Sequence, residues 1–192
     1  PDPDMALNNW ERFTQAIDDP HAHFRTMLAQ PRRLDVLLRV FSRSQFLSDL
    51  LVRCRAEVEG LTVPGRLHEP ITRDDLLRAL RRCSATAARR RDWLNELRRF
   101  RQREILRIGV RDMCLQLPIV QVTADLSSLA EACLQVALER RAGECADALC
   151  ILALGKLGGQ ELNYSSDIDL VAVCSDRCSP QGIPWVIEED LA

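Results

Sequence analysis

The fold class depends on residues 148–174, which read ALCILALGKLGGQELNYSSDIDLVAVC. Two apolar runs, 148–154 and 168–173, the second interrupted only by Asp169, flank a polar bridge that contains glycines. Apolar runs of this length, without helical periodicity, are typical of buried strands. The stretch therefore predicts two strands joined by a turn, at the opening of a mixed α and β domain.

Upstream of this stretch, apolar residues recur mostly at helical spacing. The spacing predicts a helix over residues 5–17, and Asp19-Pro20, Gln30-Pro31 and Ser44 are typical starts of three further short helices. Residues 59–70 contain two glycines and two prolines, so they predict a loop. Short helices with tight connections favour a compact bundle.

One long helix is predicted from Thr72 to about Met113, because this stretch contains no proline. Asp75 at the third helical position forms a capping box with Thr72, and a kink is expected near residues 87–91. The next helix is predicted to begin at Thr123 or Asp125 and to end at Gly143. The expected fold is mainly α, α+β overall, with a helical domain over 1–146 and a mixed domain opening over 147–192.

Composition excludes several protein classes. The 192 residues are 46% hydrophobic and 28% charged, which is typical of a globular chain. The longest apolar run is too short to cross a bilayer, and the N-terminus, PDPD, shows no signal peptide. No initiator Met is present, so we expect a piece of a longer protein. The eight cysteines form no CxxC pair, which favours reduced core residues and a cytoplasmic location.

Charge is distributed unevenly although the net charge is only −2, which gives no indication of a nucleic-acid binder. Between residues 73 and 111, 13 arginines stand against five acidic residues. Two interpretations stay open at this point: a solvated helix face whose stems cover apolar surface, or a surface for an acidic partner or a nucleotide.

The polar bridge has the chemistry of a phosphate-binding loop. Gly158 and Gly159 let a phosphate approach the backbone, and Ser165 and Ser166 can donate hydroxyl and amide hydrogen bonds to its oxygens. Lys156, the only lysine in the chain, either contacts phosphate or is a solvated turn residue. The pattern is neither a P-loop nor a dinucleotide-binding fingerprint.

Asp167 and Asp169 form the expected metal site. Two residues apart on a strand, they present both carboxylates on one face, with Cα atoms roughly 6.5–7 Å apart. Such a pair can converge on Mg²⁺, which prefers oxygen ligands, and two such ions can stabilise the attacking and leaving oxygens of a nucleotidyl transfer. The ordered combination of Gly-Gly, Ser-Ser and Asp-x-Asp between two strands predicts a metal-dependent nucleotidyltransferase site.

The motif GKLGGQELNYSSDIDL at 155–170 closely resembles the signature of the bacterial glutamine synthetase adenylyltransferases, the bifunctional adenylylating and adenylyl-removing enzymes. FRQREILRIGVRDM at 100–113 and PDPDMALNNWERF at 1–13 are similar to other segments of that family. The resemblance implies a nucleotidyltransferase-type, polymerase β-like mixed sheet after the helical bundle. It also implies that Asp167 and Asp169 are the catalytic, metal-binding carboxylates, and that the phosphate loop consists of Gly158, Gly159, Ser165 and Ser166.

The resemblance further implies an activity. Each enzyme of the family carries two such units: the C-terminal one transfers AMP from ATP to a tyrosine of glutamine synthetase, and the N-terminal one removes it by phosphorolysis, giving ADP. A PII-type signalling protein and glutamine steer the balance and so regulate nitrogen assimilation. Asn163 and the ALNNWERF opening favour the adenylyl-removing unit. The implied cofactor is Mg²⁺, and the implied partners are glutamine synthetase, the PII-type protein, ATP or ADP and phosphate, without nucleic acid or membrane.

One departure from the family pattern affects activity. The family has a third carboxylate on a later strand, in a segment like VDxRLRP, and this chain contains no such segment. We therefore expect the isolated chain to be inactive. The alternative is an inactive truncated module that serves only as an interaction domain for glutamine synthetase or a PII-type regulator. Residues 148–175 are expected to pack on the helix over 123–141, through Leu129, Cys133 and Val136, and to leave an apolar patch exposed.

Overall fold

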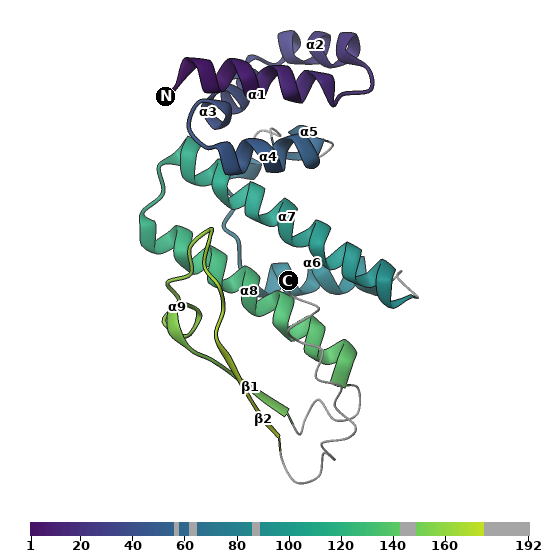
Figure 1. Ribbon diagram of the computed structural model, residues 1–192, viewed down its shortest axis with the longest axis vertical. Coiled ribbons are helices and arrows are strands. Elements are labelled where there is room, and N and C mark those ends of the chain that lie inside the picture. Colours follow the sequence, from purple (N-terminus) through teal and green to yellow (C-terminus); the bar gives the residue numbers. More distant parts are fainter. Residues whose placement is uncertain (56–57, 62–64, 86–88, 143–148, 175–192) are drawn as a thin grey trace. The chain divides into compact units, whose positions relative to one another are not determined.

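A computed structural model describes residues 1–55, 58–61, 65–85, 89–142 and 149–174 (Figure 1). This part of the chain is mainly helical with one small sheet, which confirms the expected fold class. No helix within it is both long and apolar enough to cross a membrane. The elements follow in the order α1 (Pro3–Gln15), α2 (Pro20–Ala29), α3 (Pro31–Phe41), α4 (Gln45–Arg53), α5 (Val58–Leu61), η2 (Arg66–His68), α6 (Arg73–Ala85), α7 (Arg90–Leu115), α8 (Ile119–Ala142), β1 (Leu149–Ala153), α9 (Gly155–Gly158) and β2 (Leu170–Cys174).

Helices α2, α3 and α4 begin where the capping residues and prolines predict, whereas α1 begins at Pro3, two residues before the predicted start at residue 5. The Asp19 carboxylate accepts the Ala22 amide at 3.0 Å, and the Ser44 hydroxyl accepts the Leu47 amide at 3.2 Å. Pro20 and Pro31 stand at the first position of α2 and α3. These side chains and prolines satisfy or replace amides that have no partner within the helix, so the boundaries are encoded locally.

The chain divides into two compact units. The first comprises residues 1–70 and 102–119, and the second comprises residues 71–101 and 120–192. Helix α7 contributes its first half to the second unit and its second half to the first. This division groups residues that lie close together in space, and it does not test domain limits along the sequence. The predicted domain limits, 1–146 and 147–192, therefore stay a prediction.

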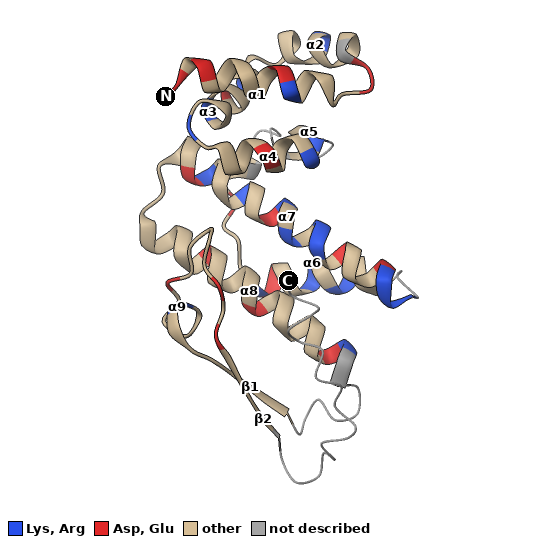
Figure 2. Ribbon diagram, in the orientation of Figure 1, with Lys and Arg blue, Asp and Glu red and all other residues tan. Residues whose placement is uncertain are grey.

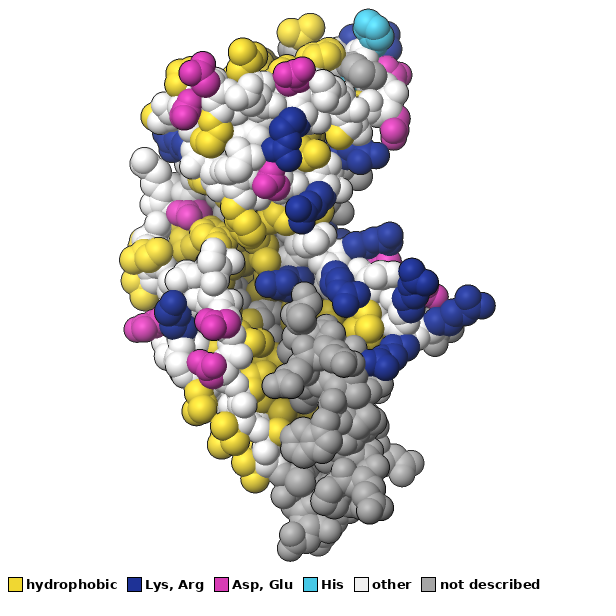
Figure 3. All heavy atoms as spheres, in the orientation of Figure 1, with side chains coloured by type: hydrophobic (Ala, Val, Ile, Leu, Met, Phe, Trp, Pro, Cys, Tyr) yellow, Lys and Arg dark blue, Asp and Glu magenta, His cyan; other side chains and the backbone are white. Residues whose placement is uncertain are grey.

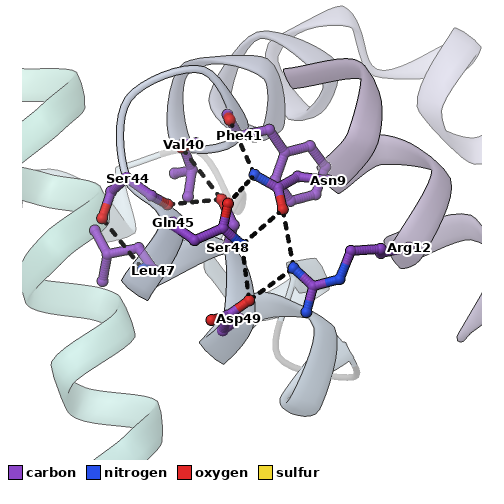
Figure 4. A network of polar contacts seen from close by, with 9 residues as sticks. All are labelled: Asn9, Arg12, Val40, Phe41, Ser44, Gln45, Leu47, Ser48 and Asp49. Atoms are coloured by element: carbon purple, nitrogen blue, oxygen red, sulfur yellow. Dashed lines mark hydrogen bonds and ion pairs between the residues drawn. The ribbon is translucent and has the colours of Figure 1, made fainter. Parts of the chain in front are cut away.

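The first unit has an aromatic core between α1 and α3, where the Phe13 and Phe41 rings lie 5.5 Å apart. A polar network extends from this core to α4 (Figure 4). The buried Asn9 amide donates to Phe41 O and to Gln45 Oε1, each at 3.2 Å. Partial burial alone would raise the pKa of Asp49, but hydrogen bonds from Arg12 and Gln45 outweigh it and lower that pKa below its ordinary value.

The prediction of one long helix over 72–113 is wrong, because α6 and α7 are separate helices. In a single helix, Leu76 and Phe100 would lie about 36 Å apart, whereas both are buried in the second unit. The break brings both helices to α8: Arg140 donates to Ser84 O at 3.2 Å and lies 5.5 Å from the Trp93 ring centroid. Half of the predicted capping box at the start of α6 is confirmed, since Thr72 Oγ1 accepts the Asp75 amide at 3.2 Å, whereas the Asp75 carboxylate accepts from the Thr72 hydroxyl.

Two further boundaries differ from the predictions. The predicted loop over 59–70 includes part of the short helix α5 and all of η2. Helix α8 begins at Ile119, directly after Pro118, and not at Thr123 or Asp125. Its first turn is exposed, with Ile119 and Val120 at 73% and 72%, so the apolar periodicity that marks a buried face begins only later. The predicted end at Gly143 lies outside the described residues.

The two predicted strands are confirmed as an antiparallel pair with Leu149 opposite Cys174 and Ala153 opposite Leu170. The second strand begins at Leu170, two residues later than predicted. The prediction that both strands are buried is wrong, because Leu152, Val171 and Val173 are 42–50% exposed. An apolar patch therefore does remain exposed on this pair, as expected from the sequence.

The buried side of α7 in the second unit provides a stability test. Leu97 is 5% exposed, whereas the neighbouring Leu94 is only half-buried. We expect Leu97→Asp to lower the free energy of unfolding by about 3 kcal/mol, because an unpaired charge enters the core. Leu94→Asp is the matched control with a smaller loss. Equal melting temperatures for the two variants would show that the burial of Leu97 does not matter.

Candidate functional site

The site segment begins with a sharp turn out of β1. Gly155 has a φ of +54°, in the left-handed region that favours glycine. A Cβ atom at this position would lie 3.1 Å from Asp169 Oδ2. The missing side chain of Gly155 therefore leaves room for one of the two predicted metal-binding carboxylates against the backbone of α9.

Gly158 is required by a second close approach. Its amide donates to Leu154 O at 3.0 Å, and a Cβ atom there would lie 2.5 Å from Ala153 O. A Cβ atom at Gly159 would lie no closer than 3.6 Å to any neighbouring atom. Gly158 thus lets α9 fold back over the end of β1, while the phosphate-binding role of both glycines stays a prediction.

Asn163 organises the turn that carries the two serines. Its Oδ1 atom accepts the Ser165 amide at 3.0 Å, and its own amide donates to Ser166 Oγ at 3.1 Å. The Ser166 amide donates to Asn163 O at 3.3 Å. Sequence reasoning used Asn163 only to compare units of the family, yet an Asn followed two residues later by a serine is a common turn signal.

The two aspartates lie in extended chain directly before β2, and not on the strand as predicted. Asp167 and Asp169 are exposed, whereas Ile168 and Leu170 between and after them are half-buried. This alternation agrees with carboxylates on one face. Asp169 O accepts the Leu154 amide at 2.8 Å, which continues the ladder one residue beyond the paired strands.

Within the described ranges, no third protein ligand joins this pair. Among the described residues, no group of three or more His, Cys, Asp or Glu side chains could hold a metal ion. Lys156 stands exposed on α9 without an ion pair to any residue that the structure describes. Both interpretations of Lys156, contact with phosphate and solvated turn, therefore stay open.

Helix α8 anchors the segment between the glycines and the serines. Ser127, which is fully buried, accepts the Leu162 amide at 3.3 Å and donates to Thr123 O at 2.8 Å. Gln160 donates to Glu131, whose other carboxylate oxygen lies 3.1 Å from Arg73 Nε. Sequence reasoning missed Ser127 and Glu131, because no local pattern indicates contacts with residues about 30 positions away.

Two leucines of the site segment are buried. Leu157 of α9 is 1% exposed and Leu162 is 7% exposed, although most residues around them are exposed. On α8, Leu129, Cys133 and Val136, the residues expected to receive this segment, are also buried. The site segment therefore contains two buried leucines and hydrogen bonds to α8, while its glycines, Ser165 and both aspartates stay exposed and Ser166 is half-buried.

Comparison with known proteins relates the chain to one family. The model of the family described as glutamate-ammonia ligase adenylyltransferase matches residues 34–188. Similar curated proteins come from Mycobacterium marinum, at 30% identity over 96% of this chain and 20% of the relative, and from Pseudomonas aeruginosa, at 35% over 72% and 16%. A third, from Streptomyces avermitilis, is 34% identical over 90% of this chain and 17% of the relative.

All three relatives bear the name bifunctional glutamine synthetase adenylyltransferase/adenylyl-removing enzyme. The chain spans about a fifth of the length of these relatives.

The two glycines after Leu157 allow a matched test of the turn. We expect Gly158→Ala to lower the free energy of unfolding by about 1–3 kcal/mol, because the added methyl group meets a backbone oxygen that cannot rotate away. Gly159→Ala, where the added methyl group makes only ordinary van der Waals contacts and the dihedrals are right-handed helical, should stay within about 0.5 kcal/mol of the parent. Urea unfolding measures both. Equal stability of the two variants would contradict the close approach at Gly158.

Proposed function

The chain belongs to the glutamate-ammonia ligase adenylyltransferase family, and from that premise we propose that it contains the opening part of a nucleotidyltransferase unit that acts on glutamine synthetase. The supporting observation is the segment over 155–170. It lies inside the matched range, and its fold places the Asp169 carboxylate against the backbone of Gly155. The names of the relatives supply the reaction and the protein substrate.

In this proposal Asp167 and Asp169 hold Mg²⁺. Their donor set suits the ion, because both are exposed carboxylates and Mg²⁺ is commonly held by one or two carboxylates together with substrate phosphates. The bound ion would polarise the phosphoryl oxygens and offset their charge. Asp167 and Asp169 are then the catalytic pair, because the ion that they would hold contacts the reacting phosphoryl group.

The phosphates of the nucleotide, or inorganic phosphate, are assigned to the loop beside the aspartates. Ser165 and Ser166 stand on the Asn163 turn with Ser165 exposed. Gly158, Gly159 and Lys156 form the other side of the proposed phosphate site, on the exposed surface of α9. These residues act by binding and orienting the phosphate, which needs donors in fixed positions more than it needs further charge.

We assign the adenylyl-removing direction to this unit. Inorganic phosphate attacks the phosphorus of the adenylyl group, a new bond to that phosphate forms, and the bond to the tyrosine oxygen of glutamine synthetase breaks. The products are ADP and a tyrosine oxygen that takes up a proton. The resemblance of Asn163 and of the ALNNWERF opening at 6–13 to the adenylyl-removing unit supports this direction.

Regulation and location belong to the same proposal. A PII-type signalling protein would act on the longer enzyme of which the chain matches a part, with glutamine as the opposing signal. A cytoplasmic location agrees with the described cysteines, since Cys54, Cys83, Cys114, Cys133 and Cys150 form no disulfide within the described part of the chain.

The aspartates test the proposal directly. In a protein that carries this segment within a complete nucleotidyltransferase unit, we expect Asp169→Asn to reduce Mg²⁺-dependent release of ADP from adenylylated glutamine synthetase about 100-fold or more, because an amide replaces a charged metal ligand. Asp4→Asn, on the exposed first turn of α1, is the control and should keep parental turnover. Full turnover by Asp169→Asn would overturn the proposed site.

A further inference from the structure

Nine of the ten arginines over residues 73–101, which include α6 and the first half of α7, fall into two groups. Four form ion pairs with acidic residues of the same unit: Arg73 with Glu131, Arg78 with Asp75, Arg81 with Glu139 and Arg99 with Glu96. Five others are exposed and form no ion pair with any residue that the structure describes, namely Arg82, Arg89, Arg91, Arg98 and Arg101. Figure 2 shows this concentration of basic residues along α6 and the beginning of α7.

Three of the five lie on one side of α7. At 100° per residue, Arg91, Arg98 and Arg101 fall within an arc of about 80°, and they span about 15 Å along the helix axis. We call these three residues the arginine strip. Figure 3 shows Lys and Arg side chains gathered over the part of the face where α6 and α7 lie in Figure 1.

The acidic residues of the same helical segment lie away from the arginine strip. Asp92 and Glu96 are rotated by about 100° and 140° from Arg91 on the helix. The residues that do adjoin the strip, Asn95 and Gln102, carry no charge. Glu104, three residues after Arg101, forms its ion pairs with Arg103 and Arg107 instead. The strip therefore presents three positive charges that form no ion pair with a described residue, in a chain whose net charge is −2.

Such an arrangement opposes stability, because Arg98 and Arg101 are like charges three residues apart. Exposed guanidinium groups bind carboxylates in bidentate geometry, which suits a partner with an acidic surface. A nucleic acid fits less well. The aromatic residues of this helix, Trp93 and Phe100, are buried, so the strip offers no aromatic platform on which bases could stack.

We propose that the arginine strip is a docking surface for an acidic patch of a folded protein. This inference rests on the proposed function, under which the protein that must be held is the glutamine synthetase substrate. The strip lies on the same unit as the site segment. It contributes to the rate and orientation of the encounter, since complementary charge between partners acts chiefly on those two quantities.

The test measures binding of the 192-residue chain to the adenylylated glutamine synthetase of the same organism, by surface plasmon resonance at low and at high salt. The variant is Arg91→Gln/Arg98→Gln/Arg101→Gln. The control is Arg25→Gln/Arg32→Gln/Arg43→Gln, which removes the same charge from three exposed arginines of the first unit that form no ion pair with described residues. Circular dichroism melting curves establish that both variants are folded.

We expect the strip variant to bind about tenfold more weakly at low salt and to lose most of the salt dependence, whereas the control stays within about threefold of the parent. Equal weakening in both variants would overturn the proposal, because it would indicate a general charge effect. Unchanged binding in the strip variant would also overturn it. Absence of binding by the parent chain at any salt would instead contradict the proposed function.

Discussion

The hydrogen bond from the Leu162 amide to Ser127 Oγ joins the site segment to the helical part of the chain. It is made at a fully buried hydroxyl, which also bonds to Thr123 O within its own helix. A buried amide left without a partner costs about 1–3 kcal/mol. Loss of the bond between Leu162 and Ser127 would therefore destabilise the packed position of the segment on α8. The turn over α9 precedes this bond and the Asn163 turn follows it, and both depend on where it holds the chain.

Helix α8 therefore contributes to the site and is more than a neighbouring part of the fold. Ser127 and Glu131 fix residues 160–162 through hydrogen bonds, and Glu131 also binds Arg73 at the start of α6. With the middle of the segment fixed, Gly155 and Gly158 fit against the end of β1, and Asp167 and Asp169 enter the sheet from a defined point. Catalysis by positioned groups requires such a support, because small displacements of a ligand or donor reduce the rate strongly.

The sequence predicted the features that local chemistry encodes. Helix starts at Asp19 and Ser44 followed from capping residues, and the two strands followed from apolar runs around a polar bridge. The spacing of residues in the sequence predicted the candidate site residues, but it did not predict the residues that contact them. The break between α6 and α7 is set by tertiary packing against α8, as Arg140 shows, and the start of α8 was missed because its first turn is exposed. Ser127 was missed because its partner lies 35 residues away.

The central claim is that α8 holds the site segment, and amide hydrogen exchange tests it most directly. Ser127→Ala removes the acceptor of the Leu162 amide, while Ser128→Ala changes the adjacent, half-buried serine, for which no side-chain hydrogen bond to a described residue is found. We predict that the Leu162 amide exchanges about tenfold faster in Ser127→Ala, equivalent to about 1.4 kcal/mol, and at the parental rate in Ser128→Ala. Parental exchange in folded Ser127→Ala, or equal acceleration in both variants, would contradict the claim.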